Sequence, residues 1–160
     1  MFGNSQAILE AVTDALDDLD LHYETDADDG VCFIDFHNGD PLIRSLHVVI
    51  SVVDEGFIVQ ADISVKADLN DYELVTALTE FVCRVNLMII GGAFYVDLNA
   101  GTIFFRSFVD CTGLESPSSD MVQRPVMFAV HYWKVIANGL GGILYGELSA
   151  EKALELCDFD

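Results

Sequence analysis

Hydrophobic and polar residues alternate with a period of two between residues 31 and 66, and this pattern predicts β-strands. The alternation falls into three runs, 31–37, 46–52 and 57–66, which are separated by turns rich in Asp, Asn and Gly. Because successive side chains of a strand point to opposite faces, the pattern places one face of an antiparallel sheet on the core and leaves the other wetter.

Shorter runs predict three further strands. One is expected at 21–25, before the alternating region. A hairpin with strands at 93–98 and 102–109 is expected around the turn at 99–101, which ends in glycine.

Apolar residues at a spacing of three to four predict a helix on either side of the alternating region. The first is expected at 5–19, with Asn4 or Ser5 as its N-cap. The second is expected at 70–86, where Asn70 is the expected N-cap.

A long helix is expected to start after Ser118 or Ser119 and to run to about Tyr145. Pro125 lies in its early part, and it either kinks the helix or resets its start because proline lacks a backbone N–H. A last short helix is expected to follow Ser149 and to end near Cys157.

The resulting element order is α-β-β-β-β-α-β-β-α-α, which predicts an α+β fold. We expect an antiparallel sheet of about five to six strands with helices packed on it. The chain of 160 residues fits a single domain over 1–160, and no long linker or internal repeat divides it.

The long helix carries two apolar stripes on different sides. The first stripe comprises Val122, Val126, Val130, Trp133, Ala137 and Leu140, and the second comprises Met121, Phe128, Tyr132 and Val135. A helix that is apolar on two sides must be covered on both. The sheet can cover one, and either the terminal helices or a second subunit must cover the other. The second stripe is therefore a candidate protein interface, and a homodimer is one way to bury it.

The composition combines high apolar content with strong acidity. Hydrophobic residues make up 52% of the chain, and 7 Lys and Arg against 27 Asp and Glu give a formal net charge of −20. Such a charge repels phosphate backbones and anionic lipid surfaces, which excludes nucleic acid as an expected partner. The acidity serves either solubility or attraction to a basic protein.

The stretch 126–145 is apolar but is not expected to span a membrane, because Lys134 lies near its middle. The segment 1–6 has neither the positive region nor the apolar region of a signal peptide. The four cysteines form no CxxC pair, so reduced thiols and a cytoplasmic location are expected.

No motif predicts a catalytic, cofactor or metal site. The acidic turn 26–30 fails the spacing of a calcium-binding loop, and the four histidines show no metal-ligand spacing. One alternative remains, which is an enzyme or small-molecule binder of unrecognised type. Its site would gather around Asp35, His37 and His47, which lie on neighbouring predicted strands.

The segments 84–97 and 101–106 combine an Asn after the central helix, a small residue before an aromatic strand, a Gly-bearing turn and a strand ending in Arg. With the tyrosine-bearing helix and the tail 146–153, they resemble the YbjN domain family of bacterial proteins, often labelled sensory transduction regulators. The chain departs from that pattern at Pro125 and near Gly141.

The resemblance implies a fold similar to that of type III secretion chaperones, with no known enzymatic activity and no catalytic residues to transfer. It also implies binding to other proteins. We therefore expect a non-enzymatic regulatory or chaperone-like protein-binding module, which needs no cofactor and has a protein partner. A third interpretation makes the chain a subunit of a larger assembly.

Overall fold

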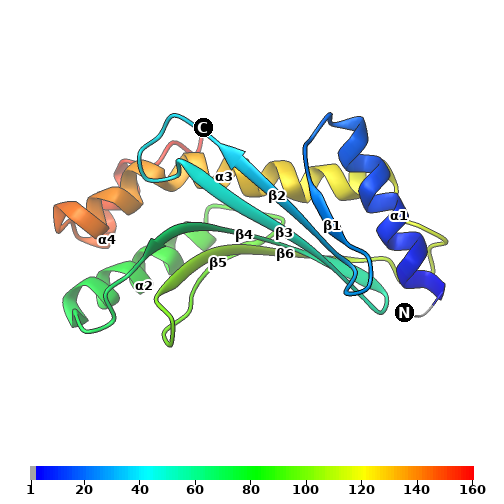
Figure 1. Ribbon diagram of the computed structural model, residues 1–160. Helices are drawn as coiled ribbons and strands as arrows, with labels where there is room; N and C mark the ends of the chain where they lie inside the picture. Colours follow the sequence, from blue (N-terminus) through cyan, green and yellow to red (C-terminus); the bar gives the residue numbers. More distant parts are fainter. Residues whose placement is uncertain (1–2) are drawn as a thin grey trace.

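The centre of the protein is a six-stranded antiparallel sheet with the strand order β1-β2-β3-β4-β6-β5 (Figure 1). The computed structural model describes residues 3–160. The strands are β1 (Glu24–Asp26), β2 (Val31–His37), β3 (Ser45–Val53), β4 (Gly56–Lys66), β5 (Ala93–Val96) and β6 (Thr102–Asp110).

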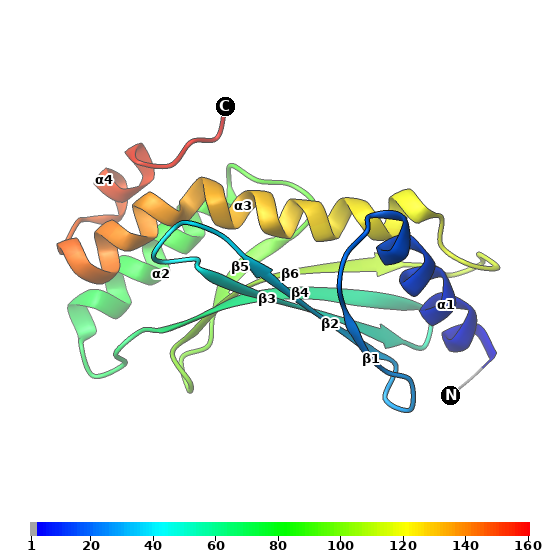
Figure 2. The same cartoon turned by 45° about the horizontal axis from the view of Figure 1, so that its top comes forward.

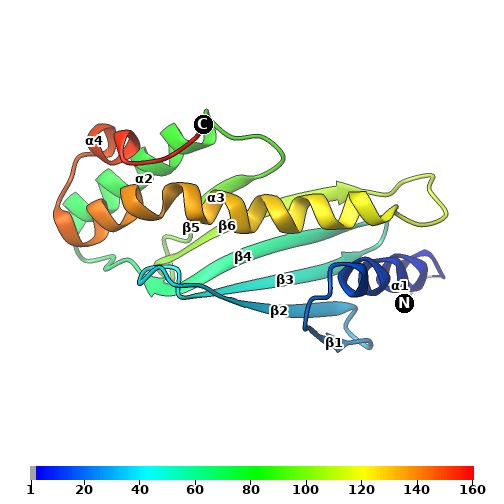
Figure 3. The same cartoon turned by 90° about the horizontal axis from the view of Figure 1, so that it is seen from above.

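Four helices complete the fold: α1 (Gly3–Asp18), α2 (Tyr72–Asn86), α3 (Ser119–Gly146) and α4 (Ala150–Glu155). Figure 2 shows α3 crossing one face of the sheet, with α1 beside its N-terminal half. Figure 3 shows α2 and α4 side by side near the C-terminal half of α3. Among the described residues no helix packs on the other face, which we call the outer face.

The predicted α+β fold and the predicted element order are confirmed. The period-two alternation translates directly into burial, because Leu46, Val48 and Ile50 of β3 are buried while His47 and Val49 lie on the outer face. A strand with one buried and one wetter face produces this pattern.

The first stripe of α3 is buried against the sheet, as expected. Trp133 is fully buried, and its indole Nε1–H donates a hydrogen bond to the Ala61 carbonyl of β4 at 3.1 Å. The ring of Phe94 meets Trp133 edge-on with centroids 5.1 Å apart, and it meets Phe105 in the same way at 5.4 Å. These contacts fix α3 on the sheet.

The first two helix boundaries differ from the predicted ones for local reasons. Asp71, and not Asn70, caps α2, since its carboxylate accepts the Leu74 N–H at 3.0 Å. Asn70 is held instead by the side chain of Asp68 in a turn. The helix α1 ends at Asp18, where Asp20 takes a positive φ of 55°, and β1 consequently begins at Glu24 rather than at residue 21.

The long helix α3 is continuous from Ser119 to Gly146. Its N-cap is Ser118, whose hydroxyl accepts the Met121 N–H at 3.3 Å. Pro125 lies inside the helix and is buried, so it does not reset the start. Ser149 caps α4 as predicted, although α4 ends at Glu155. Between residues 3 and 160, no helix has the combined length and apolarity needed to cross a bilayer.

Candidate polypeptide-binding groove

The strand β6 has a neighbour along only part of one edge. β5 pairs with residues 103–106 of β6, whereas β6 continues to Asp110. β4 pairs with the opposite edge of β6 from Phe104 to Asp110 and again at Thr102. Within the described chain, residues 107–110 therefore have a strand on one side only.

The backbone groups at this free edge can be assigned from two flanking hydrogen bonds. The Cys111 N–H donates to the Glu55 carbonyl beside β4, and the Asp97 N–H donates to the Thr102 carbonyl on the β5 side. Because backbone groups alternate along an antiparallel strand, even-numbered residues of β6 face the β5 side. The N–H and C=O groups of Phe108 and Asp110 thus face the free edge, and such an edge can accept another strand.

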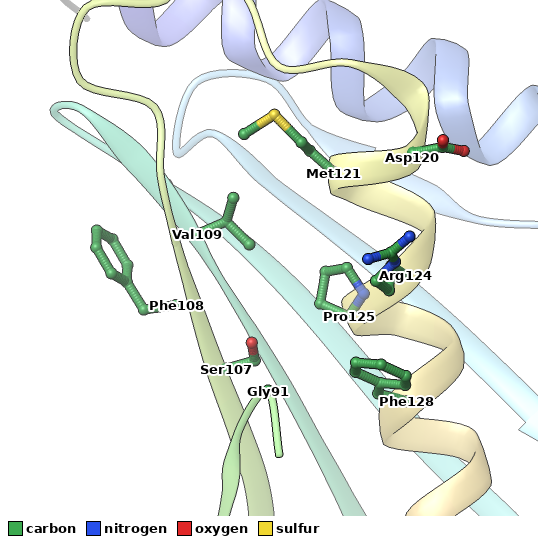
Figure 4. Close-up of a pocket in the computed structure, with 9 residues that line it drawn as sticks. All are labelled: Gly91, Ser107, Phe108, Val109, Asp120, Met121, Arg124, Pro125 and Phe128. Carbon is green, nitrogen blue, oxygen red and sulfur yellow. The ribbon is translucent and has the colours of Figure 1, made fainter.

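A groove of about 350 Å³ lies between this part of β6 and the start of α3 (Figure 4). In Figure 4, Val109 lies on the β6 side and Pro125 and Phe128 lie across from it on α3. The full lining comprises Gly91, Ser107, Phe108, Val109, Asp120, Met121, Arg124, Pro125 and Phe128. Most of this surface is apolar, and Ser107, Asp120 and Arg124 supply its polar groups.

The turn that joins α2 to β5 closes one end of the groove. The Asn86 side chain holds this turn, because its Nδ2 donates to the Phe94 carbonyl at 3.0 Å and its Oδ1 accepts the Phe94 N–H at 2.8 Å. Gly91 has a φ of +79°, and a Cβ built there would lie 2.8 Å from the Phe128 ring. The close approach of this turn to α3 therefore requires glycine.

The groove brings together two of the four residues of the second stripe. Met121 and Phe128 line it and are half-buried. Tyr132 is also half-buried, and its hydroxyl accepts the Ile90 N–H at 3.3 Å. Val135 is 7% exposed, and the C-terminal tail crosses there, with the Asp158 N–H donating to the Val135 carbonyl at 3.3 Å.

The chain itself thus covers the second stripe at Tyr132 and Val135, and the stripe opens only at its Met121 end. The turn 87–92 and the C-terminal tail provide this cover. The sequence pattern alone did not show which segments would lie against the stripe. Val135 belongs to the core, and the surface available for an interface is narrower than the stripe.

The groove is lined by one acidic and one basic side chain, and a second acidic side chain lies at the free edge of β6. Asp120 and Arg124 line it, and Asp110 ends the free edge of β6. Hydrogen bonds from Thr112 lower the pKa of the Asp110 carboxyl from its ordinary value, so this group keeps its negative charge at neutral pH.

The structure brings together two of the three residues of the alternative site. Asp35 Oδ1 lies 2.5 Å from His47 Nδ1, and His47 Nε2 lies 3.2 Å from Ser64 Oγ. His37 stands opposite Ser45 at the end of β2 and takes part in neither contact. Sequence reasoning missed Ser64, although the alternation places it on the same face as His47.

These residues lie on the open outer face of the sheet, and none of them lines the groove. The side chains of His47 and Asp35 are 42% and 63% exposed. Across residues 3–160, no three His, Cys, Asp or Glu side chains converge as metal ligands would.

A second apolar surface, which sequence reasoning also missed, lies on the turn after α2. Leu87, Met88 and Ile90 are 86%, 56% and 73% exposed. The signal was present in the sequence as a run of large apolar residues directly before Gly91.

The fold is a type III secretion chaperone-like α+β fold. The chain is similar to a solved structure described as the crystal structure of the ExsC–ExsE complex, with a TM-score of 0.52 and 10% sequence identity. The match covers 81% of this chain and 92% of that chain. At this identity the likeness establishes the fold, and it confirms the expected chaperone-like architecture.

No family model matches the chain, and no curated protein matches it in sequence. Membership of the YbjN family, implied by the resemblance in sequence, therefore stays a prediction.

Proposed function

We propose that this chain is a non-enzymatic, chaperone-like regulatory module of the YbjN type that binds an extended segment of another protein. It acts as a single domain over residues 1–160 in the cytoplasm, without a cofactor. The observation that carries this proposal is the apolar groove beside the free edge of β6. A complex of two proteins in the similar ExsC–ExsE structure supports a protein partner.

The bound segment adds to β6 where β5 ends. Its backbone pairs with the N–H and C=O groups of Phe108, which face that edge. Alternate side chains of an added strand point to one face, so every second side chain enters the groove against Met121 and Phe128. Main-chain hydrogen bonds supply affinity in this mode, and the groove selects the side chain.

Charge favours a basic segment. The chain has a net charge of −20, and Asp110 and Asp120 stand at the free edge and the groove. A segment with Lys or Arg between its apolar residues places its cations on the solvent side of the added strand, near these carboxylates. Nucleic acid and anionic membranes do not match this charge.

The turn surface of Leu87, Met88 and Ile90 supplies a contact for a homodimer. Three large apolar side chains exposed next to one another are unusual on a monomer that binds nothing there. A twofold contact would let the same turn of each subunit cover the other.

The groove is tested with two methionines of the same helix. Met121 lines the groove, whereas Met127 is 48% exposed on α3 and does not line it. A photoreactive phenylalanine analogue at position 121 should crosslink a partner that the same analogue at 127 does not. The partner peptide identified in this way is then titrated by calorimetry.

Met121→Glu should weaken binding of that peptide at least tenfold, because a carboxylate in the apolar wall must lose its hydration when a side chain of the segment packs against it. Met127→Glu should leave the affinity unchanged. Equal crosslinking from both positions, or equal affinity of both variants, would disprove the groove as the binding site. Thermal unfolding of both variants controls for loss of fold.

The dimer is tested separately by light scattering during size exclusion. Wild-type protein should run as a dimer and the Leu87→Ser, Ile90→Ser double variant as a monomer. A wild-type monomer at high concentration would refute the dimer and would leave the groove proposal intact.

A further inference from the structure

Three side chains on the outer face of the sheet form a continuous hydrogen-bonded row. Asp35 of β2 stands directly opposite His47 of β3 in the strand register. Asp35 Oδ1 lies 2.5 Å from His47 Nδ1, and His47 Nε2 lies 3.2 Å from Ser64 Oγ on β4. The row therefore crosses three strands and ends at a hydroxyl.

The carboxylate sets the direction of the hydrogen bonds. An ionised carboxylate can only accept, so the Nδ1 of a neutral His47 must carry the proton that it donates to Asp35. The Nε2 then holds a lone pair and accepts the O–H of Ser64. This is the arrangement in which an imidazole withdraws a proton from a serine and makes its oxygen nucleophilic.

Ser64 also occupies an irregular point of the sheet. The pairing of β4 with β6 slips between Asp62 and Lys66, where three residues of β4 stand against one of β6. Ser64 and Val65 have no assigned partner in β3 or in β6. A bulge re-aims the side chains it carries, and it leaves peptide N–H groups of the segment outside the regular ladder.

The geometry points to Ser64 as an activated nucleophile that accepts an acyl group from a small activated ester or thioester. Its Oγ forms a bond to the acyl carbon, and the bond from that carbon to the leaving oxygen or sulfur breaks. The proton of Ser64 passes to His47 Nε2 and from there to the leaving group.

The surroundings restrict the acyl donor. The row lies on an open face, with Ser64 exposed and His47 42% exposed, so the donor needs no entry channel. Asp62 stands opposite His47 on the other side, and burial raises the pKa of the Asp62 carboxyl, which His47 partly offsets. Carboxylates on both sides of the imidazole, in a chain of net charge −20, disfavour anionic donors.

This inference is independent of the polypeptide groove, which lies on the other side of the sheet between β6 and α3. Ser64 would be a site of covalent modification, and its acylation requires no turnover. A protein that binds a peptide normally but is not acylated, or the reverse, would separate the two proposals.

Purified protein is incubated with p-nitrophenyl acetate and, separately, with a fluorophosphonate probe. Intact mass and peptide mapping then report which serine is modified and how fast. We expect one acetyl group per chain on Ser64 and none with Ser64→Ala. Ser51→Ala is the matched control, because Ser51 lies on the outer face of β3 and pairs with Ile58 rather than with a histidine. It should be acylated at the wild-type rate.

His47→Gln should slow acylation of Ser64 about a hundredfold or more, as expected for loss of a general base. Asp35 is a positioning residue, so Asp35→Asn should slow acylation at unchanged thermal stability, and Asp35→Glu should restore part of the rate. Labelling of Ser64 no faster than that of other serines, or a rate that His47→Gln leaves unchanged, would overturn the assignment.

Discussion

Gly91 is the position where one added methyl group should do most damage to the wall of the groove. Its φ of +79° lies in the region that residues with a side chain avoid, at a cost of about 1–2 kcal/mol. A Cβ there would also lie 2.8 Å from the ring of Phe128, and overpacking of this kind costs about 1–3 kcal/mol. Gly91→Ala should therefore lower the free energy of unfolding by about 2–5 kcal/mol.

Two other glycines separate these two contributions. Gly113 has a φ of +77°, but a Cβ there meets nothing within 4 Å, so Gly113→Ala should show the backbone cost alone, about 1–2 kcal/mol. Gly39 lies outside the positive-φ region and is equally open, so Gly39→Ala should be neutral or stabilising by up to about 1 kcal/mol. The excess for Gly91 over Gly113 measures the contact with Phe128.

The assay is urea unfolding followed by far-UV circular dichroism, with each free energy taken by linear extrapolation. The excess for Gly91→Ala should disappear in a Phe128→Ala background, since the ring is then absent. Peptide binding should weaken in Gly91→Ala and not in Gly113→Ala. If Gly91→Ala and Gly113→Ala unfold at the same midpoint, the turn does not press on α3 and the described wall of the groove is wrong.

Three further predictions test other contacts of the fold. Asn86→Ala removes two hydrogen bonds to the backbone of β5 and should cost about 2 kcal/mol in urea unfolding, and a loss below about 0.5 kcal/mol would refute its role as anchor. Asp71→Ala should cost about 1 kcal/mol as a lost N-cap, whereas Asn70→Ala should change the unfolding free energy by less than about 0.5 kcal/mol. Burial raises the pKa of the Cys157 thiol to about 11, so only about one molecule in a thousand is a thiolate at pH 8. Iodoacetamide should therefore alkylate the exposed Cys83 first, and the reaction of Cys157 should accelerate as the pH rises towards 11.

The strands could be predicted because their evidence is local. Each alternating run shows its own buried face, so 31–37 coincides with β2 in the structure. The N-cap of α2 could not be predicted from the sequence alone, because two adjacent residues are both suitable. Asn70 and Asp71 both suit an N-cap, and Asp68 decides between them by holding the amide of Asn70 in a turn.

The site was harder to predict because it depends on the lengths of neighbouring strands and on which segments cover α3, rather than on residue types. The free edge of β6 exists because β5 has four residues and β6 has nine, whereas the predicted strands 93–98 and 102–109 nearly match in length. The second stripe of α3 was identified correctly as apolar. Its spacing could not show that the turn after α2 and the C-terminal tail cover Tyr132 and Val135 but leave Met121 at an open groove.

The strong acidity of the chain and the free edge of β6 are physically connected. An unpaired edge invites pairing with any strand, including the same edge of a second copy. Edge-to-edge pairing of two copies would bring their Asp110 carboxylates together, and the net charge of −20 on each copy adds to the repulsion at that contact. A basic segment relieves that repulsion when it binds, while a second copy increases it. The charge therefore keeps the edge available and selects among the strands that could occupy it, and the apolar groove beside it selects by side-chain shape.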